Sequence, residues 1–304
     1  MKPRKLLLIL ADLILLGVCI FQWTKGGKSD VKYFELSDTP DELIIQGPDT
    51  SFNIVKTGDH WFIGEKKLAA NDSSIQGLVD KISSVKALNK VAKANTEANL
   101  SRYELDDEHK ITVTAKAAGN VIRTITIGKD SNGTQGYVCF DDSTDIYLVA
   151  SNLHYVFSKT EDDLRSHIIY DFENGAVTHV EVSEADGRKW SLSRTVTEDS
   201  FSWKTTGFDE IDVDTDKTSD WMDAISSLMT SKWHDENYVI PAAKILTFNI
   251  ATDSEKVVLD IYEDYNEEEE TGSYYGRCNL TDYPFEIAEY TISKFLKEPE
   301  EFAK

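Results

Sequence analysis

Apolar and polar residues alternate along residues 111–149 in four short segments, which are separated by turn residues. Alternation with a period of two is the pattern of a β-strand with one buried face. Gly119-Asn120 forms the first of these turns, and strands that follow one another so closely pair in antiparallel order. The pattern therefore predicts an antiparallel meander of four strands.

A helical pattern precedes this meander. Between Ser73 and Asn89, apolar residues recur at three- and four-residue spacing and the opposite face is polar, as in a helix with one buried side. Asp72 or Ser73 is placed to cap its N-terminus. The apolar positions of this predicted helix are Ile75, Leu78, Val79, Ile82, Val85 and Leu88.

The same order of helix and meander occurs again toward the C-terminus. A second helix is predicted over 218–233 and a second meander over 246–287. Four pairs of residues, each in a different kind of element, are 142, 143, 139 and 138 residues apart: Trp61 and Trp203, Ile82 and Ile225, Cys139 and Cys278, Phe157 and Phe295. Near-constant spacing of this kind is typical of a duplicated unit.

The first segment of the chain has the features of a membrane anchor. Residues 6–23 are apolar except for Asp12 and Gln22, and they follow a basic tip. Eighteen helical residues reach about 27 Å, close to the hydrocarbon thickness of a bilayer. The run is longer than the core of a signal peptide, and the basic tip favours a cytoplasmic N-terminus. We therefore expect a single-pass cell-membrane protein, held in the membrane by 6–23, whose bulk is extracytoplasmic.

Asp12 lies inside this apolar run. A carboxylate at that depth costs a few kcal/mol unless it is protonated or paired. Two interpretations stay open: the surrounding Leu and Ile residues outweigh the carboxylate, or Asp12 contacts a partner helix in the membrane.

These patterns together predict an α+β fold. We expect an N-terminal transmembrane helix followed by two tandem repeats, each an antiparallel sheet with one main helix packed on one face. Trp61, Ile82, Trp203 and Ile225 are expected in the cores of the repeats. The predicted segments are a cytoplasmic tip and anchor at 1–25, a tether at 26–42, repeats at 43–157 and 177–298, a linker at 158–176 and a tail at 299–304.

Composition and charge exclude several classes of protein. The chain has 304 residues, enough for two domains, and 40% of them are hydrophobic, which argues against disorder. Its net charge is -22, and phosphate recognition needs a clustered basic surface. We therefore expect no binding to nucleic acid.

Closely spaced aspartates form the most suggestive constellation. They fit positions 1, 3, 5 and 12 of an EF-hand loop, yet Lys217 occupies position 6, where the sharp turn needs glycine. The alternative is an ordinary strand-to-helix junction that Asp216 or Thr218 caps. The weak candidates for calcium ligands are Asp212, Asp214, Asp216 and Asp223.

No other pattern indicates catalysis or a cofactor. The sequence has no serine elbow, P-loop, dinucleotide-binding glycines or zinc spacing, and its six histidines are scattered singly. Cys139 and Cys278 fall at matching predicted strand positions, where buried thiols are favoured over a disulfide. We therefore expect no cofactor, no catalytic residues and no firm metal site.

Residues 100–106, with the sequence LSRYELD, resemble the connector L-x-x-Y-G-L-D of the domain of unknown function 4340 family. These are bacterial envelope proteins often found beside gliding-motility-type ABC transporter components. Glu104 stands where the family has glycine. Four further segments also resemble the family: 125–128, 136–138, 146–148 and Leu164-Arg165.

The resemblance covers nearly the whole chain and implies a membrane-anchored accessory protein without catalytic residues to carry over. The expected function is therefore a non-catalytic, extracytoplasmic interaction module, an accessory of an ABC-type transporter or envelope complex. The alternative is an extracytoplasmic hydrolase or carbohydrate-binding protein that uses an acidic cleft between its domains.

Overall fold

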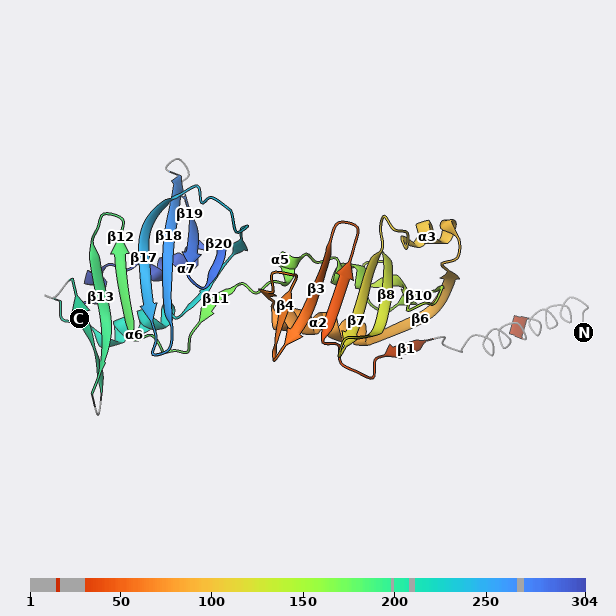
Figure 1. Cartoon of the computed structure of the whole chain (residues 1–304), viewed down its shortest axis with the longest axis horizontal. Coiled ribbons are helices and arrows are strands. Elements are labelled where there is room, and N and C mark those ends of the chain that lie inside the picture. The colour runs from red at the N-terminus through yellow and green to blue at the C-terminus, as the bar shows by residue number, and fades with distance from the viewer. Residues whose placement is uncertain (1–14, 17–30, 198–199, 208–210, 267–270) are drawn as a thin grey trace, which may run out of the picture. The chain divides into compact units, whose positions relative to one another are not determined.

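The described part of the chain folds into two compact units, with the division between Ser166 and His167 (Figure 1). This computed structural model describes residues 15–16, 31–197, 200–207, 211–266 and 271–304. The division between the units falls inside the predicted linker at 158–176, which itself contains a short helix and a strand.

Unit 1 is built on one antiparallel sheet of ten strands. Its helices are α2 (Asp72–Ser83), α3 (Glu97–Tyr103), α4 (Leu153–Phe157) and α5 (Glu161–Leu164). In spatial order the strands are β1 (Lys32–Glu35), β6 (Ser84–Lys93), β10 (Asp145–Val149), β9 (Gln135–Phe140), β8 (Asn120–Ser131), β7 (Ile111–Ala117), β2 (Glu42–Gln46), β3 (Ser51–Thr57), β4 (His60–Ile63) and β5 (Leu68–Ala69).

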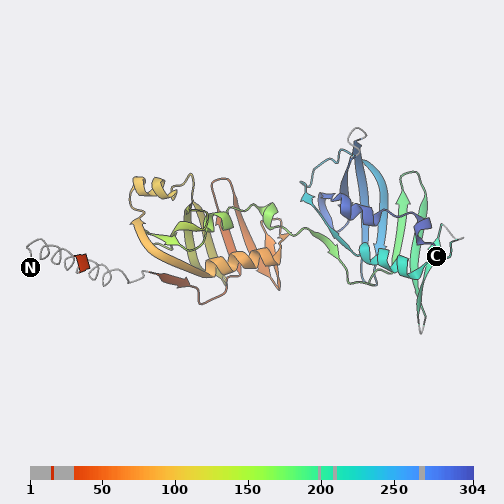
Figure 2. The same cartoon turned by 180° about the vertical axis from the view of Figure 1, so that it is seen from behind.

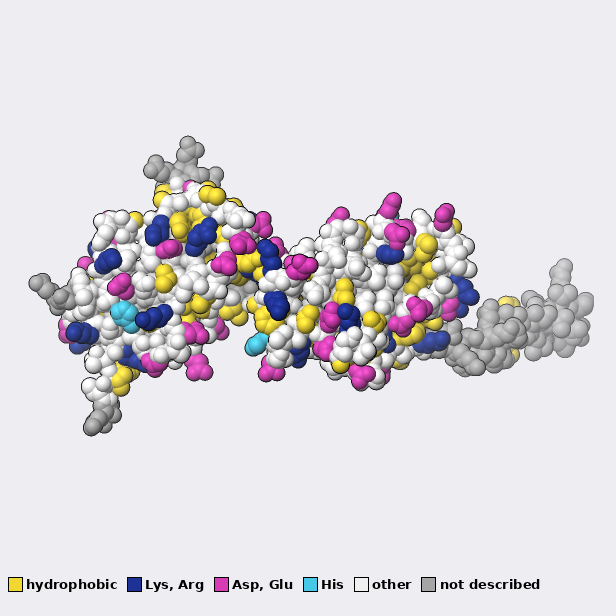
Figure 3. Space-filling model, in the orientation of Figure 1, with side chains coloured by type: hydrophobic (Ala, Val, Ile, Leu, Met, Phe, Trp, Pro, Cys, Tyr) yellow, Lys and Arg dark blue, Asp and Glu magenta, His cyan; other side chains and the backbone are white. Residues whose placement is uncertain are grey.

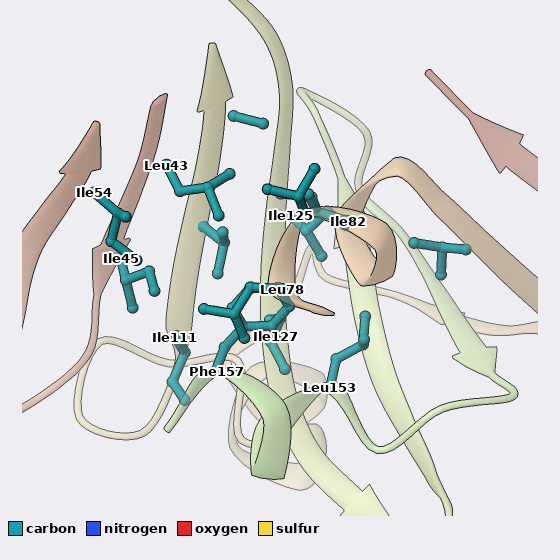
Figure 4. Packing of buried hydrophobic residues seen from close by; sticks show 14 of the residues in the cluster. Leu43, Ile45, Ile54, Leu78, Ile82, Ile111, Ile125, Ile127, Leu153 and Phe157 are labelled. Carbon is teal, nitrogen blue, oxygen red and sulfur yellow. The ribbon is translucent and has the colours of Figure 1, made fainter. Parts of the chain in front are cut away.

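Strands β7 to β10 are the predicted meander, and their antiparallel pairing confirms it. Their alternating residues supply one face of the core, because every second side chain of a strand points to the same side. Figure 4 shows Leu43, Ile45 and Ile54 from the strands in one cluster with Leu78 and Ile82 from α2. All five are at most 3% exposed.

Unit 2 has an eight-stranded antiparallel sheet and a separate pair, β11 (Ile168–Asp171) with β15 (Ser227–Met229). Its helices are α6 (Thr215–Ala224), α7 (Glu289–Phe295) and the 3-10 helix η1 (Pro299–Phe302). In spatial order the strands of the sheet are β14 (Phe201–Thr206), β13 (Lys189–Val196), β12 (His179–Glu184), β17 (Ala243–Ala251), β18 (Lys256–Asn266), β19 (Thr271–Cys278), β20 (Thr281–Ile287) and β16 (Lys232–Trp233).

The two units repeat one strand order. The order β6-β10-β9-β8-β7-β2-β3-β4 in unit 1 corresponds to β16-β20-β19-β18-β17-β12-β13-β14 in unit 2. Trp61 lies opposite Lys56 in the β3–β4 pair, and Trp203 lies opposite Arg194 in the β13–β14 pair. Ile82 and Ile225 are fully buried, Trp61 is buried and Trp203 is half-buried.

Each unit ends in a short segment that hydrogen-bonds to the start of its main helix, and we call residues 160–166 and 298–304 the clasps. Asn71 caps α2 and Asp214 caps α6. The main-chain nitrogen of Asn71 donates to the Leu164 carbonyl, and that of Asp214 donates to the Phe302 carbonyl, both at 2.8 Å. The duplication therefore extends from the sheets to the closing contacts.

The expected α+β fold, with an N-terminal transmembrane helix and helix-packed repeats, is wrong. The described residues are mostly antiparallel sheet, with 48% in strands and 19% in helices. Among the residues that the structure describes, no helix is long and apolar enough to cross a membrane. The predicted anchor at 6–23, with Asp12, lies outside the described residues except for Leu15 and Leu16.

The helices are shorter than predicted because the chain turns into strand at the helix C-terminus. Helix α2 ends at Ser83, and β6 begins at once. Val85 and Ala87 are buried while Lys86 between them is exposed, which is the period of a strand. The helix predicted over 218–233 likewise ends at Ala224.

Two details of the predicted junctions and strands also change. The cap residues are Asn71, one or two positions before the expected Asp72 or Ser73, and Asp214, two or four positions before the expected Asp216 or Thr218. Cys139 and Cys278 are buried and form no disulfide, but they do not occupy equivalent strand positions. Ile125 of unit 1 corresponds to Leu259 of unit 2, and Ile125 pairs with Phe140 whereas Leu259 pairs with Cys278. The equivalent of Cys278 is therefore Phe140.

Candidate interaction surface

Three of the segments that resemble the family, 100–106, 136–138 and 146–148, contribute to one cluster in unit 1, on the sheet face opposite the main core. Leu164 of another such segment belongs to the main core instead. Val138 and Phe140 of β9 point into the core, so Cys139 between them points to the other face. There it packs with residues of α3, of the turn that follows it and of β10. The buried members of this connector cluster are Tyr103, Leu105, Cys139 and Ile146.

Helix α3 fits this face closely at its C-terminus. Glu104 ends the helix in the left-handed conformation, with φ 55°, which glycine adopts at least cost. The rings of Tyr103 and Tyr137 have centroids 4.8 Å apart. A side chain at Gly128 would place its Cβ 2.1 Å from the Tyr103 carbonyl oxygen. Gly128 is therefore required by the close approach of the helix end to β8.

Unit 2 places a different connector, residues 234–242, against the corresponding strands. Tyr238 of this connector lies near Tyr275 of β19, with ring centroids 6.4 Å apart, and stacks on His234 at 3.8 Å. The Arg277 guanidinium donates a hydrogen bond of 2.9 Å to the Tyr238 carbonyl. Tyr275 matches Tyr137 in register, so each connector brings a tyrosine to the same strand position.

Charged groups surround the connector of unit 2. Glu286 lies 2.9 Å from Nε2 of His234 and 3.2 Å from Nζ of Lys232. Burial, followed by the proximity of Tyr238 and Glu286, raises the pKa of Tyr275 above its ordinary value. Val239 of the same connector is 82% exposed. The connector of unit 2 thus combines an exposed apolar side chain, Val239, with His234, which lies in a group of charges.

Three of the four candidate calcium ligands, Asp212, Asp214 and Asp223, make contacts around α6. Asp214 accepts hydrogen bonds from the main chain of Asp216 and Lys217. Asp212 pairs with Lys304 at 3.1 Å, and Asp223 accepts a hydrogen bond from the Gly175 amide, a contact outside the loop. In the part of the chain that the structure describes, no three His, Cys, Asp or Glu side chains are grouped to hold a metal ion.

Carboxylates do share one cavity within unit 2. This cavity of about 580 Å³ lies between β11, the turn from β17 to β18 and Leu280. Tyr170 and Phe172 stack in its wall with ring centroids 5.1 Å apart. Its four acidic residues are Asp171, Glu173, Asp253 and Glu255.

Sequence reasoning located the connector of unit 1 through its motif but missed the connector of unit 2. The signal was available in the tyrosines: Tyr103 and Tyr238 lie in the connectors, and Tyr137 and Tyr275 lie in the strands beneath. An alignment of the two repeats that matches Tyr137 with Tyr275, instead of Cys139 with Cys278, places the two connectors at equivalent positions.

The comparisons with known proteins agree with the motif in 100–106. A family model described as "Domain of unknown function (DUF4340)" matches residues 61–244, more than half of the chain and a range that includes both connectors. No curated protein and no solved structure gives a significant match. The chain therefore belongs to the domain of unknown function 4340 family.

Proposed function

We propose that the protein is a non-catalytic, membrane-anchored extracytoplasmic interaction module, an accessory of an ABC-type transporter or envelope complex. One observation carries this proposal: the two units repeat a strand order but present unlike connectors at the same place on the sheet. Loops positioned by a rigid scaffold are where binding residues concentrate. A duplicated scaffold with two different connectors is suited to binding two different surfaces.

The chemistry of the connectors supports protein binding over catalysis. Unit 1 presents the polar outer side of α3, including exposed Glu97 and Arg102. Unit 2 presents the exposed Val239 in the connector whose first residue, His234, pairs with Glu286. Acidic side chains are spread over both units in Figure 3, as expected for a net charge of -22. The apolar run at 6–23 would keep both connectors close to a membrane complex.

The proposal is tested by site-specific crosslinking of the full-length chain in native membranes. A photoreactive residue replaces Val239 or Glu97 in the connectors, and Lys256, an exposed residue at the start of β18, serves as the control position. We expect a transport or envelope subunit to be captured from a connector position and not from the control. Repeated recovery of no such subunit from either connector would overturn the proposal.

The hydrolase or carbohydrate-binding alternative is favoured by the acidic cavity of unit 2. Glycoside hydrolysis needs two carboxylates at a defined separation, and the cavity contains four. Release of reducing ends from envelope polysaccharide by the purified chain, lost in both Asp171→Asn and Glu255→Gln, would establish the alternative. Activity that survives both substitutions would remove the cavity from consideration.

A further inference from the structure

The hairpin of β13 and β14 ends the sheet of unit 2 with an uncovered edge. Strand β14 is the last in the spatial order, and no described strand pairs with its outer side. The hairpin projects past α6 in both views of the chain (Figure 1, Figure 2). In unit 1 the corresponding edge strand, β4, is covered by β5, which pairs with Phe62 and Ile63. An uncovered edge strand is a template for pairing with another chain.

The main-chain groups along this edge face outward at every second residue. The main-chain nitrogen of Thr197 donates to the carbonyl of Ser200 across the turn at 2.8 Å, so these two residues form a hydrogen-bonded pair. Hydrogen-bonded and non-hydrogen-bonded pairs alternate along an antiparallel ladder. The residues whose N–H and C=O groups face away from β13 are therefore Phe201, Trp203 and Thr205.

The internal repeat shows how these groups are bonded where the edge is covered. The equivalent of Trp203 in unit 1 is Trp61. Its main-chain nitrogen donates to the Asp72 carboxylate at 2.8 Å, and its carbonyl accepts from the Ala70 nitrogen at 2.9 Å. In the part of the chain that the structure describes, no residue bonds to the outward N–H or C=O of Trp203. Counted from the helix caps, residues 211–212 stand in the place of β5, but they form no strand.

The side chains beside this edge are apolar on the face that carries the core. Val196 and Phe201 form a cross-strand pair and are 70% and 44% exposed. Trp203 lies next to Phe201 on the same face, with ring centroids 6.4 Å apart. Its indole donates to the Ser219 hydroxyl of α6 at 3.2 Å, so an apolar strip starts at the core and continues past the helix. A strand added beside β14 would place every second side chain along this strip.

The opposite face of the hairpin is polar, and the charges of its two strands are all positive. Lys204 of β14 is exposed on that face and forms no ion pair within the described ranges. Strands β13 and β14 contain no carboxylate, and their charged residues are Lys189, Arg194 and Lys204. The turn residues Glu198 and Asp199 lie outside the described residues. In a chain with a net charge of -22, these strands favour an acidic partner.

We infer that the outer edge of β14 binds an extended segment of another protein, added as an antiparallel strand, in which apolar and acidic residues alternate. Antiparallel pairing is the arrangement of β4 and β5 in unit 1. The apolar side chains then lie beside Phe201 and Trp203, and the acidic side chains lie beside Lys204. Main-chain hydrogen bonds supply affinity, and the two rows of side chains supply specificity. The edge is separate from both connectors, so the inference does not depend on the partner binding proposed for them.

The test uses the full-length chain in lipid nanodiscs and a fluorescein-labelled peptide with the sequence VEVEVEV. Fluorescence anisotropy measures binding, with empty nanodiscs as the blank. We expect saturable binding of this peptide and roughly tenfold weaker binding of VKVKVKV, because Lys204 repels its lysines. Lys204→Glu should reverse this preference. Lys256→Glu, at an exposed position of β18, is the matched control and should leave the preference unchanged.

Methylation of the peptide nitrogens tests main-chain pairing without a change to the protein. In the antiparallel arrangement the valine N–H groups face β14 and the glutamate N–H groups face away from it. Methyl groups on the valine nitrogens should therefore abolish binding, and methyl groups on the glutamate nitrogens should preserve it. Phe201→Ser should weaken binding of the unmethylated peptide, because it removes apolar surface that the valines cover.

Light scattering shows whether a second copy of the chain occupies the edge instead. Thr205→Pro removes one outward N–H group, and circular dichroism establishes that this variant and Lys204→Glu are folded. A dimer of the native chain that Thr205→Pro converts to a monomer would assign the edge to a second copy and overturn the inference. The inference is also overturned if VEVEVEV does not bind, if both methylated peptides bind equally, or if folded Lys204→Glu keeps the original preference.

Discussion

Arg123 is a buried cation whose hydrogen-bond partners are main-chain carbonyls. It is 7% exposed, and its guanidinium donates to the carbonyls of Phe34 at 2.9 Å, Ile82 at 3.0 Å and Glu35 at 3.2 Å. Burial lowers the pKa of Arg123 below its usual value. Two of the three carbonyls belong to β1, so this one side chain attaches the first described strand to the end of α2.

Unit 2 satisfies the equivalent carbonyl in another way. Val257 occupies the register position of Arg123, and the Tyr170 hydroxyl donates to the Ile225 carbonyl at 3.2 Å. A neutral donor replaces the cation at the same place in the fold. The internal repeat thus shows that the hydrogen bond is required and that the charge is not.

The first prediction concerns Arg123→Met, which keeps an unbranched side chain but removes the donors. We expect the free energy of unfolding to fall by roughly 2–4 kcal/mol, since three carbonyls lose a charged donor at once. Urea unfolding measures the change. Arg102→Met, at an exposed position of α3, is the control and should be nearly silent, and equal stability of the two variants would contradict the role of Arg123.

The second prediction concerns Glu104, the non-glycine residue at the left-handed end of α3. Glu104→Gly should be more stable than Glu104→Ala by about 1 kcal/mol, because only glycine adopts this conformation without a steric penalty. Thermal unfolding of the two variants gives the difference. If the alanine variant is the more stable of the two, the left-handed conformation of Glu104 is incorrect.

At the scale of elements, both clasps depend on carboxylates. In the clasp of unit 1, hydrogen bonds from the main chain and side chain of Thr160 lower the pKa of Asp163 below 3.8. In the clasp of unit 2, Lys297 and then the Glu298 amide lower the pKa of Glu301 below 4.5. A lowered folded-state pKa adds stability above the unfolded-state value, and this stability is lost as the pH falls through the folded-state value.

The third prediction follows for Asp163→Asn. The native chain should lose stability as the pH falls below about 5, where the unfolded carboxyls begin to bind protons. The variant should be less stable at neutral pH and lose less on acidification. Thermal unfolding between pH 7 and pH 2.5 measures both slopes, with Asp49→Asn at an exposed turn as the control. Parallel curves for the native chain and the Asp163 variant would exclude the clasp as a pH-dependent contact.

At the scale of the whole molecule, the two units have separate cores. Ile82 belongs to the main cluster of unit 1 and Ile225 to that of unit 2, and both are fully buried. A cavity created in one core should therefore leave the other core unchanged, because distant sites without shared partners act independently.

The fourth prediction is that calorimetry resolves this independence. Ile82→Ala and Ile225→Ala should each cost about 2–5 kcal/mol, and each should lower the unfolding transition of its own unit only. The double variant should show the sum of the two effects. A single transition that both substitutions lower equally would mean that the units unfold as one cooperative body.

The sequence by itself determined the elements whose pattern is local. Alternation over 111–149 predicted the meander, helical spacing located the starts of both main helices to within three residues, and the motif in 100–106 indicated the family. The repeated order of elements indicated the duplication. These features depend only on residues that are close together in the sequence, so the spacing of apolar residues is enough to predict them.

Only the tertiary structure decided where partners from distant segments replace a local pattern. Val85 fits a continued helix as well as a strand, and its pairing with Phe34 of β1 makes it strand. Cys278 points into the main core of unit 2, whereas Cys139 points to the sheet face opposite the main core of unit 1. Their spacing in the sequence suggested equivalent positions, but the pairing of the strands places them one residue out of register. Before α6, Asp214 is the helix cap and its main-chain nitrogen bonds to Phe302 of the clasp, while Asp212 pairs with Lys304. These contacts depend on C-terminal residues that lie far away in the sequence. Pairing and register depend on contacts between residues far apart in sequence, which no local periodicity encodes.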